Sequence, residues 1–161
     1  MTLAEAARDF LAQDRIAVVG VSRQAGEAAN FVFRKLRDAG HTVFPVNPRT
    51  GEVEHVPCYP NVRSIPGGVG AVLIFTPPAA SADVVRECAD LGITRVWLHR
   101  SLGPGSVSAE ALQVAEERHL TVIAGGCPAM FCAPVDLPHR CMRWVLDWTG
   151  KLPQHVGPPA A

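Results

Sequence analysis

In the stretch IAVVGVS, residues 16–22, a continuous apolar run ends at Gly20 and a helix-forming segment follows. A strand, a glycine turn and a helix start thus fall within the first 30 residues. Such a turn lets a phosphate group reach the backbone N–H groups at the start of the helix, which have no partners within it. The stretch therefore predicts a strand at about 15–20 that leads into a site for a nucleotide-type ligand.

Strand-like and helical segments alternate along the rest of the chain. Further strands are expected at 42–46, 71–75, 94–98 and 121–124. Helices are expected within 1–14 and at 28–39, 79–90, 106–119 and 138–149, with Ser106 as a cap and one helical turn at 61–64. The strands are short, continuous and rich in Val and Ile, which is typical of strands buried on both faces. The pattern predicts an α/β fold with a doubly wound, Rossmann-like sheet of five parallel strands and helices on both faces.

The overall composition indicates one globular domain without a strong charge. The chain has 161 residues, which we divide into a single domain at 1–150 and a disordered tail at 151–161. Fifteen basic and fifteen acidic residues balance, so we expect no nucleic-acid partner. No apolar run approaches the roughly 18 residues of a membrane span, and the acidic N-terminal segment does not read as a signal peptide. We therefore expect no membrane partner and a cytoplasmic location.

Five cysteines without a C-x-x-C pair predict reduced thiols rather than disulfides or a metal centre. Cys127, Cys132, His139 and Cys141 cluster in the sequence, but their spacing fits no standard zinc pattern, and we expect no metal. Cys127 follows two glycines, whose N–H groups could stabilise a reactive thiolate. The alternative, a buried inert thiol, is our preferred interpretation.

The ends of the first two strands indicate which nucleotide is bound. In the dinucleotide fingerprint G-x-G-x-x-G, Ser22 here replaces the second glycine. An NAD site usually ends its second strand with an acid, whereas this chain reads Asn47-Pro48-Arg49. A guanidinium gives bidentate bonds to a phosphate, so a phosphorylated ribose is favoured, as in NADP or coenzyme A. The alternative for Arg49 is a solvated loop arginine.

The third strand ends in two consecutive prolines, Pro77 and Pro78, directly after Thr76. Proline has no N–H and a fixed φ, so the pair would form a stiff apolar lip beside the ligand crevice. An adenine ring or a pantetheine arm could lie along this lip. The alternative is simple termination of the strand.

In their order along the chain, these motifs resemble those of the small CoA-binding domain proteins, together with the Trp97-Leu98 strand and Cys127-Pro128. Such proteins are similar to the nucleotide-binding domain of the succinyl-CoA synthetase alpha subunit, and the resemblance covers roughly 14–132. It implies that coenzyme A or an acyl-CoA is the cofactor. With their motif neighbours Arg23 and Asn47, the residues implied to bind it are Gly20, Val21, Ser22, Pro48, Arg49, Thr76 and Pro77.

No convincing catalytic pair accompanies these motifs. His99 follows the fourth strand and could face the site, but we prefer a capped polar residue beside Arg100 and Ser101. We therefore predict a binding protein, a carrier, sensor or regulatory module, rather than an enzyme. The alternative is an NADP-dependent oxidoreductase or NADP-binding module. Trp144 and Trp148 are expected to pack on the sheet or to form an interface, which makes a homodimer conceivable.

Overall fold

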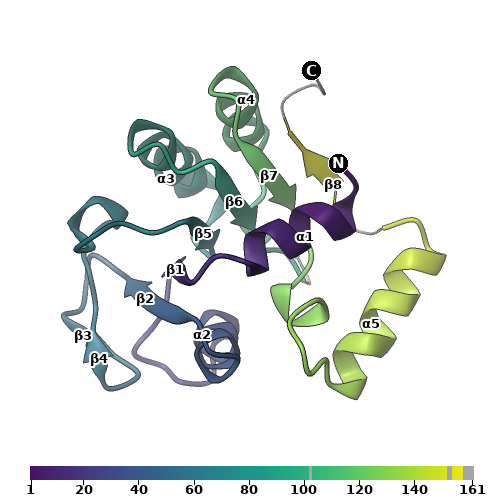
Figure 1. The fold of residues 1–161 in the computed structure, drawn as a ribbon, viewed down its shortest axis with the longest axis horizontal. Coiled ribbons are helices and arrows are strands. Elements are labelled where there is room, and N and C mark those ends of the chain that lie inside the picture. Colours follow the sequence, from purple (N-terminus) through teal and green to yellow (C-terminus); the bar gives the residue numbers. More distant parts are fainter. Residues whose placement is uncertain (102, 152–153, 158–161) are drawn as a thin grey trace.

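The computed structural model describes residues 1–101, 103–151 and 154–157. Its main sheet has the strand order β2-β1-β5-β6-β7-β8 (Figure 1). The first five of these strands are parallel, and β8 pairs with β7 in the antiparallel sense. Their bounds are β1 (Arg15–Val19), β2 (Thr42–Val46), β5 (Ala71–Ile74), β6 (Arg95–Leu98), β7 (Thr121–Ala124) and β8 (Gln154–Val156). The predicted five-stranded parallel sheet is confirmed.

The inner strands of the sheet are buried on both faces, and nearly all of their residues are apolar. All four residues of β5 are buried, as are the last four of β1. Side chains alternate between the two sheet faces, so each face needs its own cover of helices.

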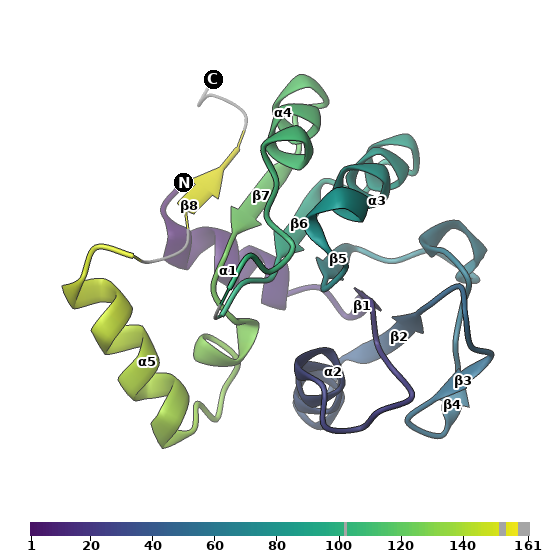
Figure 2. The same cartoon turned by 180° about the vertical axis from the view of Figure 1, so that it is seen from behind.

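The helices cover both faces of the sheet, as Figures 1 and 2 show from opposite sides. One core cluster joins one face of the sheet to α1 (Leu3–Leu11) and α2 (Ala28–Asp38). A second cluster joins the other face to α3 (Pro78–Asp90) and α4 (Ala109–Glu117). The predicted doubly wound, Rossmann-like arrangement is confirmed.

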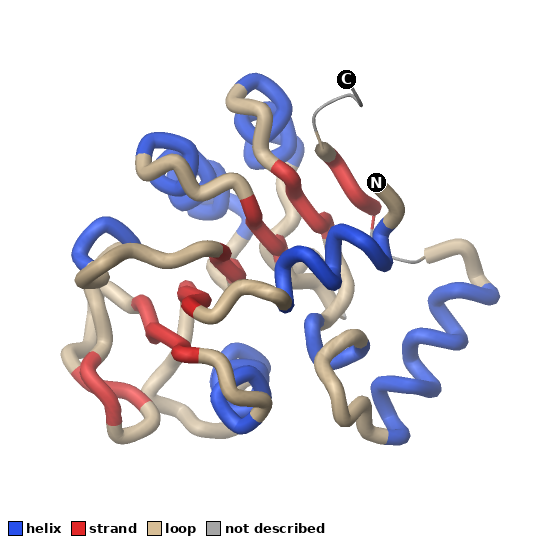
Figure 3. Tube along the Cα trace, in the orientation of Figure 1, coloured by secondary structure: helices blue, strands red, loops and turns tan. Residues whose placement is uncertain are grey.

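The strand order reverses between β1 and β5. After β1 the chain adds β2 on one side, then returns to the other side of β1 to build β5, β6 and β7. Figure 3 shows the strands in red, side by side, with the helices in blue on both sides of them. Ligands of such sheets bind beyond the carboxyl ends of the strands, at the point of reversal.

Two local features differ from the sequence prediction. The cap of α4 is Ser108, whose side chain accepts the Ala111 N–H, and not Ser106. Ser106 is buried and its N–H donates to the His99 carbonyl at 2.8 Å. The segment after β2 also forms a hairpin of β3 (Glu52–Val53) and β4 (Val56–Pro57), which the sequence did not predict. The expected helical turn is present as η1 (Val62–Ser64).

The last helix, α5 (Leu137–Trp148), stands at the rim of the fold beyond η2 (Pro128–Met130), at the right in Figure 1. Trp144 and Trp148 on this helix are 67% and 79% exposed. The expectation that they pack on the sheet is therefore wrong, because their side chains point away from the core. No helix in the described part of the chain is long and apolar enough to span a bilayer.

Only part of the segment expected to be a disordered tail, 151–161, belongs to the described residues. Gln154–Val156 forms the edge strand β8, while residues 152–153 and 158–161 lie outside the described residues. The tail as a whole stays a prediction.

Candidate functional site

Gly20 brings the turn after β1 into contact with the end of β5. Its φ is +98°, a conformation that costs a residue with a side chain roughly 1–3 kcal/mol. A Cβ atom at this position would lie 3.1 Å from the Phe75 carbonyl carbon and 3.3 Å from the Thr76 nitrogen. The Gly20 N–H also donates to the Val46 carbonyl at 2.9 Å. The ends of β1, β2 and β5 therefore meet here, and only glycine fits between them.

Asn47 ties the loop after β2 to the loop after β1. Its side-chain amide donates to the Val21 carbonyl at 2.8 Å. Its side-chain oxygen accepts the Arg49 N–H at 2.8 Å, which shapes the turn that carries Arg49. Both polar groups of Asn47 are thus used within the protein. We assign it a positioning role between the two loops.

Between these loops lies an open pocket of about 460 Å³. Its lining residues are Ser22, Arg23, Gln24, Asn47, Arg49 and Thr50. Arg23 and Arg49 are exposed, and no salt bridge holds either one among the described residues. The lining contains two guanidinium groups and no carboxylate, so its chemistry suits a phosphorylated ligand.

The other predicted residues do not line this pocket. Val21 is fully buried in the core, and Pro48 is exposed on the loop before Arg49. Thr76 and Pro77 lie at the start of α3, where the buried Ser81 hydroxyl donates to the Pro77 carbonyl at 3.2 Å. β5 ends at Ile74, Pro78 begins α3 with Pro77 as its cap, and the exposed Pro77 occupies the position predicted for the lip.

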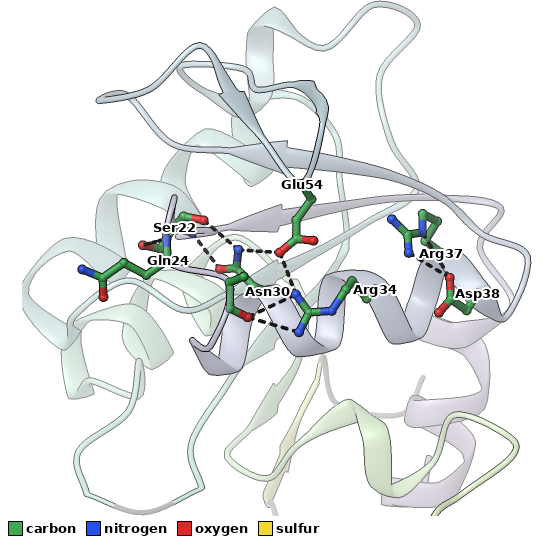
Figure 4. A network of polar contacts seen from close by, with 8 residues as sticks. Ser22, Gln24, Asn30, Arg34, Arg37, Asp38 and Glu54 are labelled. Atoms are coloured by element: carbon green, nitrogen blue, oxygen red, sulfur yellow. Dashed lines mark hydrogen bonds and ion pairs between the residues drawn. The ribbon is translucent and has the colours of Figure 1, made fainter.

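A buried asparagine that the sequence analysis missed fixes the first loop (Figure 4). Asn30, 1% exposed on α2, accepts the Ser22 N–H at 3.0 Å and donates to the Ser22 carbonyl at 2.7 Å. The Ser22 hydroxyl in turn accepts the Gln24 N–H at 3.0 Å. The backbone N–H and carbonyl of Ser22 are therefore both occupied by a protein partner. The only sequence signal was a polar residue on the apolar face of a helix.

The β3–β4 hairpin places a carboxylate beside this network. Glu54 accepts from Asn30 at 2.8 Å and pairs with Arg34 at 2.7 Å, and its side chain is 10% exposed. Arg34 also donates to the Ala25 carbonyl at 3.1 Å. Since Arg34 compensates the buried charge of Glu54, the carboxylate holds the hairpin to α2 without repelling an anion nearby.

His99 lies in a buried position at the end of β6, next to the end of β5. Its ring stacks on Phe75 with centroids 4.2 Å apart, and its Nε2 lies 2.9 Å from the Ser101 hydroxyl. Burial lowers the pKa of His99 from 6.5 to about 4, so the ring is neutral at physiological pH. The preferred interpretation, a polar residue capped by Ser101, agrees with this geometry. His99 braces Phe75, which in turn bounds Gly20.

Cys88, Cys127 and Cys132 are buried thiols, whereas Cys141 is exposed. Burial raises the pKa of Cys127 to about 11, which keeps it protonated and favours the inert alternative. All five cysteines are free. No group of three His, Cys, Asp or Glu side chains in the described ranges could hold a metal ion.

A second pocket, of about 510 Å³, opens at the carboxyl ends of β6 and β7. Arg100, Gly125, Gly126 and Lys151 are among its lining residues. Because β5 separates β1 from β6 in the sheet, the Pro77 lip lies between this pocket and the one lined by Arg49.

Comparisons with known proteins identify relatives of the part of the chain that forms the five parallel strands. A family model described as CoA binding domain matches residues 14–133. The chain is 29% identical over 121 residues to ADP-forming acetate–CoA ligase I of Archaeoglobus fulgidus, which is 71% of this chain and 18% of the ligase. It is 30% identical over 113 residues to YneT, an uncharacterized protein of Bacillus subtilis strain 168, which is 70% of this chain and 81% of YneT.

The chain also resembles proteins whose structures have been solved. A hypothetical protein from Pyrococcus horikoshii OT3 matches with a TM-score of 0.72 and 31% identity, over 79% of this chain and 87% of that one. The chain thus spans less than a fifth of the ligase it matches, and most of the length of the two smaller proteins.

Removing the Asn30 amide should destabilise the fold. In Asn30→Ala the Ser22 N–H and carbonyl lose a buried partner, which costs about 1–3 kcal/mol of unfolding free energy. Urea unfolding followed by circular dichroism measures this cost. Gln113→Ala serves as the control, because it removes an exposed hydrogen bond from the Gln113 side chain to Glu117. Its unfolding free energy should change by no more than about 0.5 kcal/mol. Equal stability of the two variants would contradict the role of Asn30.

The buried His99 should make stability fall in acid. The unfolded chain protonates this histidine near its ordinary pKa of 6.5, whereas folded His99 takes up a proton only near 4. The stability it contributes above pH 6.5 is therefore lost as the pH falls toward 4, by on the order of 3 kcal/mol. Thermal unfolding between these pH values should show a larger loss for wild type than for His99→Gln, whose side chain does not titrate. Identical losses would refute the assignment.

Proposed function

This chain belongs to the CoA-binding domain family, as the order of its motifs predicted, and from that premise we propose that it binds coenzyme A or an acyl-CoA. The observation that carries the proposal is the pair of guanidinium groups, Arg23 and Arg49, in a pocket whose lining has no carboxylate. A ribose without a phosphate would be better served by an acid at the end of β2. A ribose phosphate is better served by arginine.

We place the 3′-phosphate of the cofactor against Arg49 and its diphosphate near Arg23 and the start of α2. The α2 cap residue, Glu27, makes no side-chain hydrogen bond to the helix start, so N–H groups remain there for an anion. From this pocket the pantetheine arm would pass the lip at Thr76 and Pro77. Its acyl end would then reach the pocket that Arg100 and Lys151 line.

We propose carriage, sensing or partner regulation rather than turnover. The lining of the Arg49 pocket contains no His, Cys, Asp or Glu that could act as an acid, a base or a nucleophile. The two candidates nearby, His99 and Cys127, are held neutral by burial. The ligase activity belongs to the name of the longer relative, and our proposal does not extend it to this chain. The free state of all five cysteines supports a cytoplasmic location. We propose that residues 1–150 act as a single binding domain.

The binding test compares four ligands by thermal shift: coenzyme A, dephospho-CoA, NADP and NAD. A ligand at 100 times its Kd adds about 2.7 kcal/mol of stability, which corresponds to a rise of roughly 5–11 °C for a domain of this size. With all four ligands at one concentration, 100 times the Kd of coenzyme A, we expect this rise with coenzyme A and a smaller one with dephospho-CoA. A rise with NADP and none with coenzyme A would favour the alternative, an NADP-binding module or oxidoreductase.

Arg49→Ala tests the assigned phosphate contact. The loss of a charge-assisted hydrogen bond should weaken coenzyme A binding by about 1.5–3 kcal/mol in titration calorimetry. The affinity for dephospho-CoA should not change, because that ligand has no 3′-phosphate. Arg118→Ala, at the end of α4 away from the pocket, is the matched control. An equal loss with both ligands would remove Arg49 from its proposed role.

A further inference from the structure

Helix α5 has two faces that differ sharply in their surroundings. On the inner face Met142 and Leu146 pack, half-buried, against the core cluster of α1 and α2. His139 on the same face stacks on Phe31 with centroids 5.5 Å apart. The helix is therefore anchored to its own chain by this face, and its outer face is free to contact something else.

The outer face is a stripe of exposed apolar residues. Leu137 is 70% exposed, and Trp144 and Trp148, whose rings stack 6.1 Å apart, are exposed as well. Cys141, which lies between Leu137 and Trp144 in the sequence, is exposed as well. Monomeric proteins rarely leave such a patch uncovered.

The spacing of this stripe is that of a helix that packs against another helix. Positions 137, 141, 144 and 148 follow one another at intervals of four, three and four. This is the a/d pattern of a two-helix seam, in which each side chain fits among side chains of the facing helix. The natural occupant of the stripe is a helix with the same spacing.

The charges beside the stripe match those of a second copy that runs in the opposite direction. In an antiparallel pair about a two-fold axis, Cys141 shares a layer with the partner's Trp144, and Leu137 with the partner's Trp148. The same two-fold rotation brings Arg140 of each copy beside Asp147 of the other copy. Two equivalent contacts therefore form, related by the axis. Neither Arg140 nor Asp147 is in a salt bridge within the described part of its own chain. A parallel pair would instead place Arg140 beside Val145.

We propose that α5 is a homodimer interface, in which two copies of this chain pair their outer faces antiparallel and exchange Arg140–Asp147 ion pairs. The two-fold operation makes the interface isologous, so one sequence supplies both halves. Each tryptophan can bury about 150–250 Å². Four of them bring the contact near the roughly 1,000 Å² that a specific interface needs. The expected dimer is therefore weak and depends on concentration.

Sedimentation velocity of the full chain, over a range of concentrations, tests this pairing. Wild type should shift from monomer to dimer as the concentration rises. Arg140→Asp and Asp147→Arg each place like charges across the axis, so each should weaken the dimer by about tenfold or more. An equimolar mixture of the two variants restores opposite charges at both contacts, and it should recover the dimer as a heterodimer, identified by native mass spectrometry.

Controls separate this pairing from a folding defect or from another interface. Glu116→Arg reverses an exposed charge on α4, across the sheet, and should leave the dimer unchanged. All variants should keep the circular dichroism and the coenzyme A affinity of wild type, because no residue of α5 lines the Arg49 pocket. Three results would each overturn the proposal: wild type monomeric throughout, a dimer insensitive to both reversals, or a mixture that stays monomeric.

Discussion

The close approach of two backbones at Gly20 is the constraint on which the site depends. The turn after β1 passes so near the end of β5 that a Cβ atom would have no room beside Phe75 and Thr76. On its other side the Gly20 N–H is bonded to the end of β2. The carboxyl ends of β1, β2 and β5 therefore lie together at the point where the strand order reverses. The loops that follow these strands have to share one small region of surface.

Two side-chain amides fix the positions of the loops that form the pocket. Asn47 holds the loop after β2 to the loop after β1, and Asn30 holds the loop after β1 to α2. The backbone groups of Ser22 are occupied in this way, and the charged groups that line the pocket are Arg23 and Arg49. In our proposal this pocket holds the phosphate groups of the cofactor. The neutral His99 and Cys127 nearby contribute packing and bracing.

Much of this could be predicted from the sequence, because the signals were local and redundant. Continuous apolar runs predicted the parallel strands, and the glycine turn and Asn47-Pro48-Arg49 predicted where the ligand loops meet. The hairpin was missed because its two turn residues, Glu54 and His55, adopt positive φ without the usual glycine or asparagine. The Asn30 network was missed because its partners lie far apart in the sequence. The exposure of Trp144 depends on which face of α5 meets the core, and apolar periodicity alone could not decide that.

The central claim is that arginine side chains at the end of β2 and after β1 receive the phosphorylated adenosine end of coenzyme A. A crystal structure of this chain with coenzyme A tests it most directly. The account predicts the 3′-phosphate within hydrogen-bonding distance of the Arg49 guanidinium, with the pantetheine arm passing Pro77. Density for the cofactor elsewhere, or Arg49 turned into bulk solvent beside a bound cofactor, would contradict it.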